Sequence, residues 1–386
     1  MSKPYYVTLT GSRNNAGDFL IRHRGHHLLR TLRPDRDVRD MNSWEPLTDA
    51  QVEEINGSAG LILLGGPALR QDLYPNVYPL VEDLSRITAP ITIMGAGWKA
   101  YPGYWEDSRD YQYTEKSLSL LRRIEQSGLP ISVRDYRTLN ALKHSGVNAG
   151  VMTGCPALYV PDMIGTAFSG YDPSSIKKLV FSLGVNFVDS VTQEQQTKDI
   201  ILALRSANPS AELNVAFHHS ISAEDLREAY GARPRFAARH AAIIDWLKAE
   251  NIAYTDISGG VEKMLALYEA ADFHVGYRVH AHILMSSLSK PSVLLTEDGR
   301  GRGLKEVLGG LIFDSYRTKT MALVPRVLNK LGVLDMDRYP ASPGVAKDIV
   351  DNLAYEAGVG APRLGQTRGQ IDRHFSVMKE FIARLP

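Results

Sequence analysis

The segment 276–281 contains the residues of this chain whose types and spacing best suit chemistry. Arg278 and His280 lie two residues apart, where the short apolar stretch 273–275 gives way to a segment of helical character, 281–289. In an open α/β sheet this position is the carboxyl end of a strand, where ligands bind. A fixed cation beside a titratable imidazole suits an anionic substrate that must be protonated. Alone, each residue is more simply a solvated arginine or a capping histidine, but the pair at a strand end predicts a functional site.

A second arginine, Arg134, follows the strand-like run 131–133 in the first half of the chain. We expect it to reach into the same site. A helix-start pair of Arg134 and Asp135, with Asp135 as the cap and no ligand present, explains this segment about equally well. His218 ends another strand-like run, and we expect it to contact the substrate.

Glycines follow the first three strand-like runs of the chain. Glycine lets backbone amides approach a ligand closely, and amides that open a helix attract anions. Each loop alone is weak evidence because glycine is common in turns between strands and helices, but together they predict a cleft lined by backbone. The spacing is not that of a dinucleotide-binding loop, because no Gly-x-Gly-x-x-Gly follows the first strand. The glycines that we expect to line the site are Gly17, Gly65, Gly66 and Gly97.

The elements that must position these residues alternate along the chain between short apolar runs and amphipathic segments. This alternation is typical of parallel sheets covered by helices on both faces. The predicted strands are 6–9, 60–64, 91–94, 131–133, 150–152, 179–183, 213–217, 253–256, 273–275 and 292–295. The predicted helices between them include 113–126, 136–144, 193–206, 240–250 and 262–270.

A polar, turn-rich stretch at 161–173 predicts a boundary between two domains. With 386 residues, the chain is long enough for each domain to bury its own core. We therefore predict the α/β class, with two Rossmann-like domains that face one another across a cleft, as in the GT-B architecture. The predicted parts are an N-terminal domain (1–165), a C-terminal domain (166–365), and a C-terminal helix (366–386) that packs across the junction.

Composition and charge argue against several classes of protein. The net charge is +1, whereas a nucleic-acid partner would require a strongly basic face, so we expect none. The single cysteine, Cys155, cannot form an internal disulfide and fits a reducing compartment. The amino terminus lacks the apolar core of a signal peptide, and no run approaches the ~18 apolar residues of a membrane span. We expect a cytoplasmic protein without a transmembrane segment.

A basic stretch in the first helix contains His23, His26 and His27. No further ligand at metal spacing accompanies them, so we expect no metal site there. A solvated face, or one attracted to an anionic acceptor or lipid headgroup, explains the stretch better. Peripheral association with the inner face of the plasma membrane is one expectation from this charge.

Six short blocks run in a fixed order through most of the chain. They are Asn15-Ala16-Gly17-Asp18, Leu63-Leu64-Gly65-Gly66, Gly95-Ala96-Gly97, Ser132-Val133-Arg134-Asp135, Pro156-Ala157-Leu158 and Gly276-Tyr277-Arg278-Val279-His280-Ala281. With these blocks the chain resembles the polysaccharide pyruvyl transferase family over about residues 15 to 295. Two features depart from the family's pattern, namely His26-His27 in the first helix and Cys155 where an aspartate commonly precedes the proline.

The resemblance implies that a pyruvyl group moves from phosphoenolpyruvate to sugar hydroxyls, with formation of a cyclic ketal and release of phosphate. Arg134 and Arg278 would bind the donor's carboxylate and phosphate. His280 would protonate its methylene carbon. Asp18 would accept a hydroxyl proton or hold the acceptor, although a helix-capping role is equally compatible. We expect no cofactor, because arginines and helix N-termini can carry the anion.

The resemblance also implies two partners, phosphoenolpyruvate on the C-terminal domain and a saccharide or lipid-linked glycan on the N-terminal domain. The aromatic loop 101–105 could stack on sugar rings, and ordinary loop packing explains it as well. Two other functions fit the same residues. A nucleotide-sugar-dependent GT-B glycosyltransferase would use Arg134, Arg278 and the glycine loops to bind a diphosphate. A non-catalytic glycan- or anion-binding protein would bind without turnover, and the Arg278–His280 pair argues against it.

Overall fold

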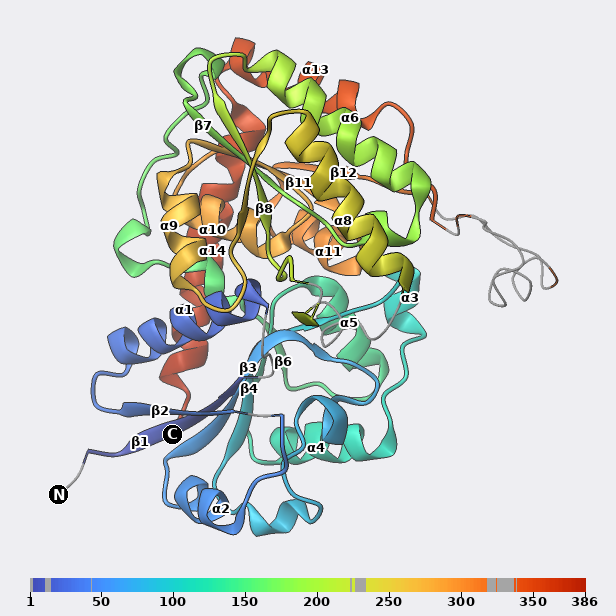
Figure 1. The fold of residues 1–386 in the computed structure, drawn as a ribbon. Helices are drawn as coiled ribbons and strands as arrows, with labels where there is room; N and C mark the ends of the chain where they lie inside the picture. The colour runs from blue at the N-terminus through green and yellow to red at the C-terminus, as the bar shows by residue number, and fades with distance from the viewer. Residues whose placement is uncertain are drawn as a thin grey trace.

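The computed structural model describes residues 3–10, 15–42, 44–222, 224–225, 234–317, 324, 337 and 339–386. Within this described part the chain forms two six-stranded sheets, one in each lobe (Figure 1). The strand orders are β2-β1-β3-β4-β5-β6 and β12-β11-β10-β7-β8-β9. Neighbouring strands within both sheets run parallel. The prediction of an α/β protein with two Rossmann-like domains is confirmed.

The first lobe contains the elements that precede residue 153. They are β1 (Tyr5–Thr10), α1 (Ala16–Leu32), β2 (Asp37–Asn42), α2 (Asp49–Asn56), β3 (Gly60–Leu69), β4 (Ile91–Trp98), α3 (Trp105–Arg109), α4 (Glu115–Gln126), β5 (Ile131–Val133), α5 (Tyr136–His144) and β6 (Gly150–Met152). A single turn of 3-10 helix, η3 (Pro156–Leu158), follows and packs against α1 and α10.

The second lobe contains the remaining strands and most of the remaining helices. They are β7 (Lys178–Ser182), α6 (Val191–Ala207), β8 (Glu212–Phe217), α8 (Pro234–Ala249), β9 (Ala253–Asp256), α9 (Glu262–Ala270), β10 (Phe273–Gly276), α10 (Val279–Ser287), β11 (Ser292–Thr296), α11 (Gly299–Leu308), β12 (Leu311–Asp314), α13 (Val345–Val359) and α14 (Pro362–Ala383). The predicted domain boundary falls between β6 and β7.

The ten predicted strands are all present, and the structure adds two that the sequence did not indicate. One is β2, which has the sequence Asp-Val-Arg-Asp-Met-Asn and is largely exposed. The other is the four-residue β12. Both are edge strands with one neighbour, β1 for β2 and β11 for β12. An edge strand needs no continuous apolar run because much of it faces water, and β2 has none. In contrast, β12 contains the apolar run Leu311 to Phe313, which was not predicted as a strand.

The strand order of each sheet reverses at one point. In the first sheet the reversal lies between β1 and β3, and in the second it lies between β7 and β10. At such a point the connections leave in opposite directions and open a crevice beyond the carboxyl ends of the strands. The helix α1 begins beside the first reversal and α10 beside the second, so the fold directs both helices toward the candidate site.

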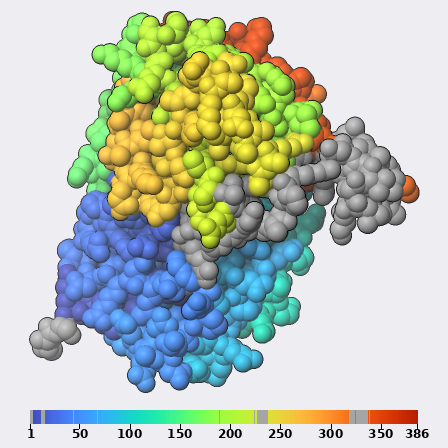
Figure 2. All heavy atoms as spheres, viewed as in Figure 1, coloured from blue at the N-terminus to red at the C-terminus, as the bar shows by residue number. Residues whose placement is uncertain are grey.

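The two lobes are joined by a continuous apolar core. One buried cluster includes Leu20 of α1, Leu284 of α10, and Phe375 and Met378 of α14. The helix α14 begins at Pro362 rather than near residue 366, and it contacts α1 and β6 in the first lobe and α10 and α11 in the second (Figure 1). The space-filling view shows the orange and yellow surface of the second lobe directly against the blue surface of the first (Figure 2). Among the described residues, no helix is both long and apolar enough to cross a bilayer.

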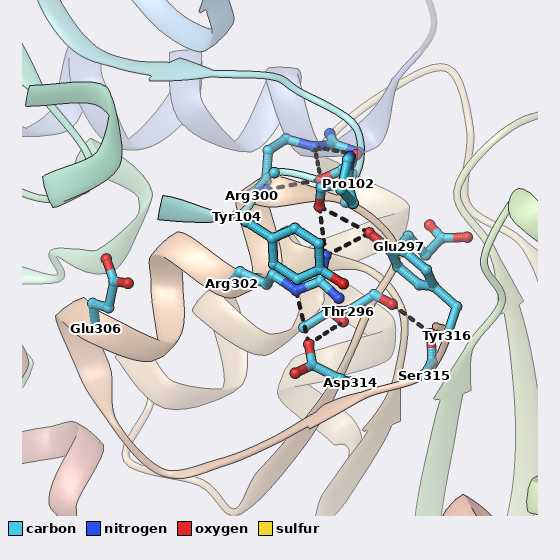
Figure 3. A network of polar contacts seen from close by, with 12 residues as sticks. Pro102, Tyr104, Thr296, Glu297, Arg300, Arg302, Glu306, Asp314, Ser315 and Tyr316 are labelled. Atoms are coloured by element: carbon cyan, nitrogen blue, oxygen red, sulfur yellow. Dashed lines mark hydrogen bonds and ion pairs between the residues drawn. The ribbon is translucent and has the colours of Figure 1, made fainter. Parts of the chain in front are cut away.

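A second junction fastens the loop after β4 to α11. Arg302 donates from Nε to Asp314 Oδ1 at 3.0 Å, and from Nη1 to the Pro102 carbonyl at 2.5 Å and to Tyr316 Oη at 2.7 Å. Its guanidinium also lies 4.6 Å from the centre of the Tyr104 ring. Figure 3 shows Arg302 enclosed by these groups. The loop 99–104 of the first lobe is therefore held against the second lobe.

Candidate active site

Arg278 lies at the carboxyl end of the second sheet, where the sequence placed it. It is the N-cap residue of α10, directly after β10 and Tyr277. Its backbone N donates to Ser182 Oγ at 3.1 Å, and its Nε donates to the Leu183 carbonyl at 2.7 Å. Its Nη1 lies 3.2 Å from His219 Nε2. The guanidinium is thus fixed between the ends of β7 and β10, and part of its hydrogen-bonding capacity is already in use.

His280 lies in the first turn of α10 and faces the other lobe. Its side chain is buried, with 5% of the residue exposed. A Cβ on Gly17 of α1 would lie only 2.1 Å from His280 Nδ1, so glycine at this position lets the ring fit between the lobes. Its Nε2 has no hydrogen-bond partner within the described part of the chain. Burial, Arg134, Arg300 and Arg278 together hold the pKa of His280 well below its usual value, so the imidazole is neutral near pH 7.

Arg134 follows β5 in the first lobe, and its guanidinium lies close to His280. The residue is 4% exposed. A Cβ on Gly97 would lie 1.9 Å from Arg134 Nε, so the absence of a side chain there makes room for the guanidinium. Within the described residues, Nη1 and Nη2 are buried without any hydrogen-bond partner. Buried polar groups are nearly always paired, so an open guanidinium fork indicates a site for an anion.

Asp135 has a structural role beside this open guanidinium. It is the N-cap of α5 and accepts hydrogen bonds from Thr138 N at 2.7 Å and from Thr138 Oγ1 at 2.8 Å. Burial raises the pKa of its carboxyl group, and its Oδ2 is 3.7 Å from Arg134 Nε. The capping expected for Asp135 is therefore present, and it leaves the Arg134 fork unused.

Asp18 lies in the first turn of α1, at the reversal point of the first sheet. The N-cap of this helix is Asn15, whose Oδ1 accepts from Gly17 N at 3.3 Å and whose Nδ2 donates to Asp18 Oδ2 at 2.9 Å. Capping thus falls to Asn15 rather than to Asp18. A Cβ on Gly66, where φ is +88°, would lie 2.9 Å from Asp18 Oδ1. A Cβ on Gly65 would likewise lie only 2.5 Å from the Gly95 carbonyl oxygen, so there is no room for a side chain at this position either.

A cavity of about 880 Å³ opens beside Asp18 in the first lobe. Its walls combine aromatic rings, amides, hydroxyls and charges of both signs, a mixture suited to sugars. They are Asp18, Trp44, Gly65, Ala68, Arg70, Gln71, Asp72, Asn76, Val77, Lys99, Ala100, Tyr101, Tyr111 and Thr114. From the aromatic loop 101–105, only Tyr101 lines this cavity. Asp18 lines the cavity, and a Cβ on its sequence neighbour Gly17 would meet the His280 ring.

The structure separates the two adjacent histidines after β8. His218 is 1% exposed, and its Nε2 lies 2.8 Å from Tyr268 Oη. Burial lowers the pKa of His218 well below its ordinary value, and its contact with substrate stays a prediction. His219, which follows the same strand, lies against Arg278. Burial and then Arg278 lower the pKa of His219 to about 2.

Two further cations, Arg300 and Lys99, were not assigned to the site from the sequence, and the charge of Arg300 helps to lower the pKa of His280. Arg300, after β11, forms a double hydrogen bond with Asp298 from Nε and Nη2 (Figure 3). Lys99, after β4, lines the cavity. Asp298 is the N-cap of α11, and its side chain accepts from Arg300 N at 2.9 Å. Cys155 is fully buried with its pKa raised to about 11, which fits an inert thiol.

Three solved structures are remotely similar to the chain. The UDP-GlcNAc 2-epimerase from Neisseria meningitidis bound to UDP-GlcNAc is 11% identical, with 98% of this chain and all of that chain covered and a TM-score of 0.47. A putative UDP-N-acetylglucosamine 2-epimerase from Listeria monocytogenes is 9% identical over 100% and 98% of the two chains, at 0.47. The N-terminal domain of trehalose-6-phosphate phosphatase from Candida albicans is 12% identical over 98% of each, at 0.48. These likenesses carry no argument about function.

Among proteins with curated functions, none matches the chain. The family model for polysaccharide pyruvyl transferase matches residues 15–299, which is well over half of the chain. The matched range contains Asp18, Arg134, Arg278 and His280. Arg300 lies just outside it. On this match, the chain belongs to the polysaccharide pyruvyl transferase family.

Proposed function

We propose that this protein transfers the pyruvyl group of phosphoenolpyruvate to two hydroxyls of one sugar in a saccharide or lipid-linked glycan. The product would be a cyclic ketal, with phosphate released. The observation that carries the proposal is the open guanidinium of Arg134, buried beside the unpartnered Nε2 of His280. An anionic group would pair with the guanidinium, and a basic atom of the same molecule would accept a proton from the imidazole. Phosphoenolpyruvate has both an anionic group and such an atom.

In the proposed complex the donor lies between the lobes, near Arg134, Arg278 and His280. A guanidinium binds a carboxylate or phosphate through two parallel hydrogen bonds, and both terminal nitrogens of Arg134 remain available for this. Three negative charges on the donor would offset the neighbouring guanidiniums that lower the pKa of His280. Donor binding should therefore raise that pKa and let the imidazole take up the proton it must give.

The reaction begins with proton transfer from His280 to the methylene carbon, which becomes a methyl group. The C2 carbon is then electron-deficient, and the oxygen of one sugar hydroxyl forms a bond to it. The proton of this hydroxyl passes to a base, for which Asp18 is our candidate. The oxygen of a second hydroxyl then bonds to C2 while the bond from C2 to the phosphate oxygen breaks. The electron pair leaves with the phosphate. One hydroxyl proton replaces the one given by His280, and the other leaves on hydrogen phosphate.

In this proposal the acceptor occupies the cavity beside Asp18. Trp44, Tyr101 and Tyr111 offer ring faces, and amide and hydroxyl groups offer hydrogen bonds. Aromatic faces and a few polar groups are the usual components of a small-molecule site. In this proposal Asp18, which lines the cavity, is the group that acts on the attacking hydroxyl.

The test is to incubate the full chain with phosphoenolpyruvate and a panel of glycans. We expect phosphate release together with a gain of pyruvyl mass on at least one glycan. His280→Ala should bind phosphoenolpyruvate yet give neither product. A panel in which no glycan gains pyruvyl mass, with a larger thermal shift from nucleotide diphosphates than from phosphoenolpyruvate, would favour a glycosyltransferase instead.

A further inference from the structure

Lys99 and Arg300 form a second pair of cations at the domain junction. The backbone N of Gly299 donates to the Ala100 carbonyl at 3.2 Å, a hydrogen bond between the two lobes. Lys99 and Arg300 flank this bond, one from each lobe. Gly103 packs so closely on Gly299 that a Cβ there would lie 2.2 Å from the Gly299 Cα. The close contact of these two loops therefore brings the two cations together next to the cavity.

Arg300 is held in a fixed orientation. Its Nε donates to both oxygens of Asp298, at 2.9 and 3.0 Å, and its Nη2 donates to Oδ2 at 2.7 Å. The Asp298 side chain is 5% exposed and that of Arg300 is 18% exposed. Within the described residues, Nη1 of Arg300 has no hydrogen-bond acceptor. A guanidinium oriented by a buried carboxylate is pre-organised to bind a further anion with its remaining donors.

Lys99 lies opposite this oriented guanidinium. It lines the cavity together with Asp18 and forms no hydrogen bond or ion pair with the described part of the chain. Arg300, followed by burial, lowers the pKa of Lys99. Two cations that repel one another are stabilised when an anion lies between them, so the pair is arranged for a ligand of negative charge.

The donors near His280 can be divided between the two anionic groups of phosphoenolpyruvate. The open fork of Arg134 matches one planar carboxylate. Arg278 already uses Nε on Leu183 and Nη1 on His219, so it has fewer free donors. The phosphate carries more charge and more oxygens than the carboxylate, and lysine is a frequent phosphate ligand because its ammonium acts as a point charge.

We propose that Lys99 and Arg300 bind the phosphate of the enol phosphate donor, while Arg134 binds its carboxylate. This assignment rests on the proposed function. It gives the pair a role in the second step, in which the C2–O bond breaks and its electron pair leaves with the phosphate. Two cations beside that oxygen stabilise the charge that develops there. Because one cation comes from each lobe, the phosphate subsite is complete only with both lobes in contact.

Calorimetry on the full chain can separate the two anion subsites. Phosphoenolpyruvate, inorganic phosphate and pyruvate would be titrated into the wild type, Lys99→Met and Arg134→Met. Lys116→Met serves as the control, since it removes the same charge from the exposed face of α4. We expect Lys99→Met to lower the affinity for phosphate and for phosphoenolpyruvate about tenfold or more, which is the value of one charge-assisted contact. Its affinity for pyruvate should not change. Arg134→Met should lower the affinity for pyruvate and phosphoenolpyruvate and leave the affinity for phosphate unchanged.

Three outcomes would overturn the assignment. Phosphate affinity that Lys99→Met leaves unchanged would remove the lysine from the subsite. If Lys99→Met lowers the affinities for phosphate and pyruvate equally, the lysine acts through its charge at a distance and not through contact with the phosphate. If phosphate binding depends on Lys99 but phosphate does not compete with phosphoenolpyruvate, Lys99 and Arg300 bind a different anion, such as a phosphate of the acceptor. A wild type that does not bind phosphoenolpyruvate at all would instead end the proposed function together with this inference.

Discussion

Arg134 and Arg302 are both buried at the domain junction, but their surroundings differ. Their side chains are 5% and 6% exposed, respectively. Arg302 donates to Asp314, Pro102 and Tyr316 and lies over two tyrosine rings. Arg134 approaches only Asp135, at 3.7 Å, and its two terminal nitrogens have no acceptor within the described residues. The same side chain thus serves the fold in one place and is left open in the other.

The difference matters because a buried polar group without a partner costs free energy. The penalty is about 1–3 kcal/mol for a neutral group and more for a charged one. A fold retains such a group when a ligand completes it, and sites that bind ligands are where such strain collects. The comparison therefore predicts opposite effects when the two arginines receive the same substitution.

Arg134→Met is expected to have the largest effect on activity. Loss of the buried, open guanidinium fork of Arg134 should lower kcat/KM roughly a thousandfold, or about 4 kcal/mol. The free energy of unfolding should stay the same or rise, since an unpaired buried charge is removed. Steady-state kinetics and chemical denaturation measure the two quantities. A variant that loses stability and keeps its activity would make Arg134 structural.

Arg302→Met should show the reverse pattern. Its hydrogen bonds join the loop 99–104 to α11, and hydrogen bonds to charged groups contribute about 1.5–3 kcal/mol each. We expect the free energy of unfolding to fall by about 3 kcal/mol, measured by denaturation under the same conditions. Donor affinity of the folded fraction should change far less than in Arg134→Met. If the variant is as stable as the wild type, Arg302 is not needed for the fold, and the contrast between its role and that of Arg134 is lost.

The pH dependence of donor binding sharpens the comparison, because His280 is the second open group. Burial and three guanidiniums lower its pKa well below the usual value in the free protein, and the donor's charges should raise it. Binding should then take up a proton. Between the two pKa values, affinity should fall about tenfold for each unit that the pH rises. Calorimetry in buffers of different ionisation enthalpy measures the uptake, and it should vanish in His280→Gln. Equal uptake in that variant would assign the proton to another group.

The smallest effect is expected from a pair of glycine substitutions. Gly17→Ala and Gly369→Ala both place alanine in a helix, which by itself favours the helix by about 1 kcal/mol. Gly369 has nothing within 4 Å of a new Cβ, whereas at Gly17 the Cβ meets the His280 ring at 2.1 Å. Gly369→Ala should raise the free energy of unfolding, and Gly17→Ala should lower activity through displacement of the ring. If both variants have wild-type activity, the ring has room to move.

Much of the fold could be predicted because its strands are buried on both faces. Runs such as 61–64 and 293–295 are apolar throughout, and the polar residues Thr296 and Glu297 after the second run indicate the end of its strand. This is why Arg278 and His280 could be assigned to the carboxyl edge of one sheet and Arg134 to the carboxyl edge of the other. The polar edge strand β2 lacks that signal, since it contains Asp37, Arg39 and Asp40.

Parts of the candidate site depend on contacts that the sequence does not encode locally. Asn15 and Asp18 are both good capping residues, and the extended backbone of Asn15, with φ −88° and ψ 115°, decides between them. Lys99 and Arg300 meet only because Gly299 bonds to Ala100 across the junction. His218 and His219 are neighbours, and the fold gives their rings different partners, Tyr268 Oη for His218 and Arg278 Nη1 for His219.

The apolar core that runs from α1 through α10 into α14 has a consequence for engineering and for evolution. Because Leu284 is buried in one cluster with residues of both lobes, removal of either lobe would expose apolar surface on the other. Under the proposed function, a change of acceptor preference is therefore better sought in single substitutions around the cavity, at positions such as Trp44 and Gln71, than in the exchange of a whole lobe.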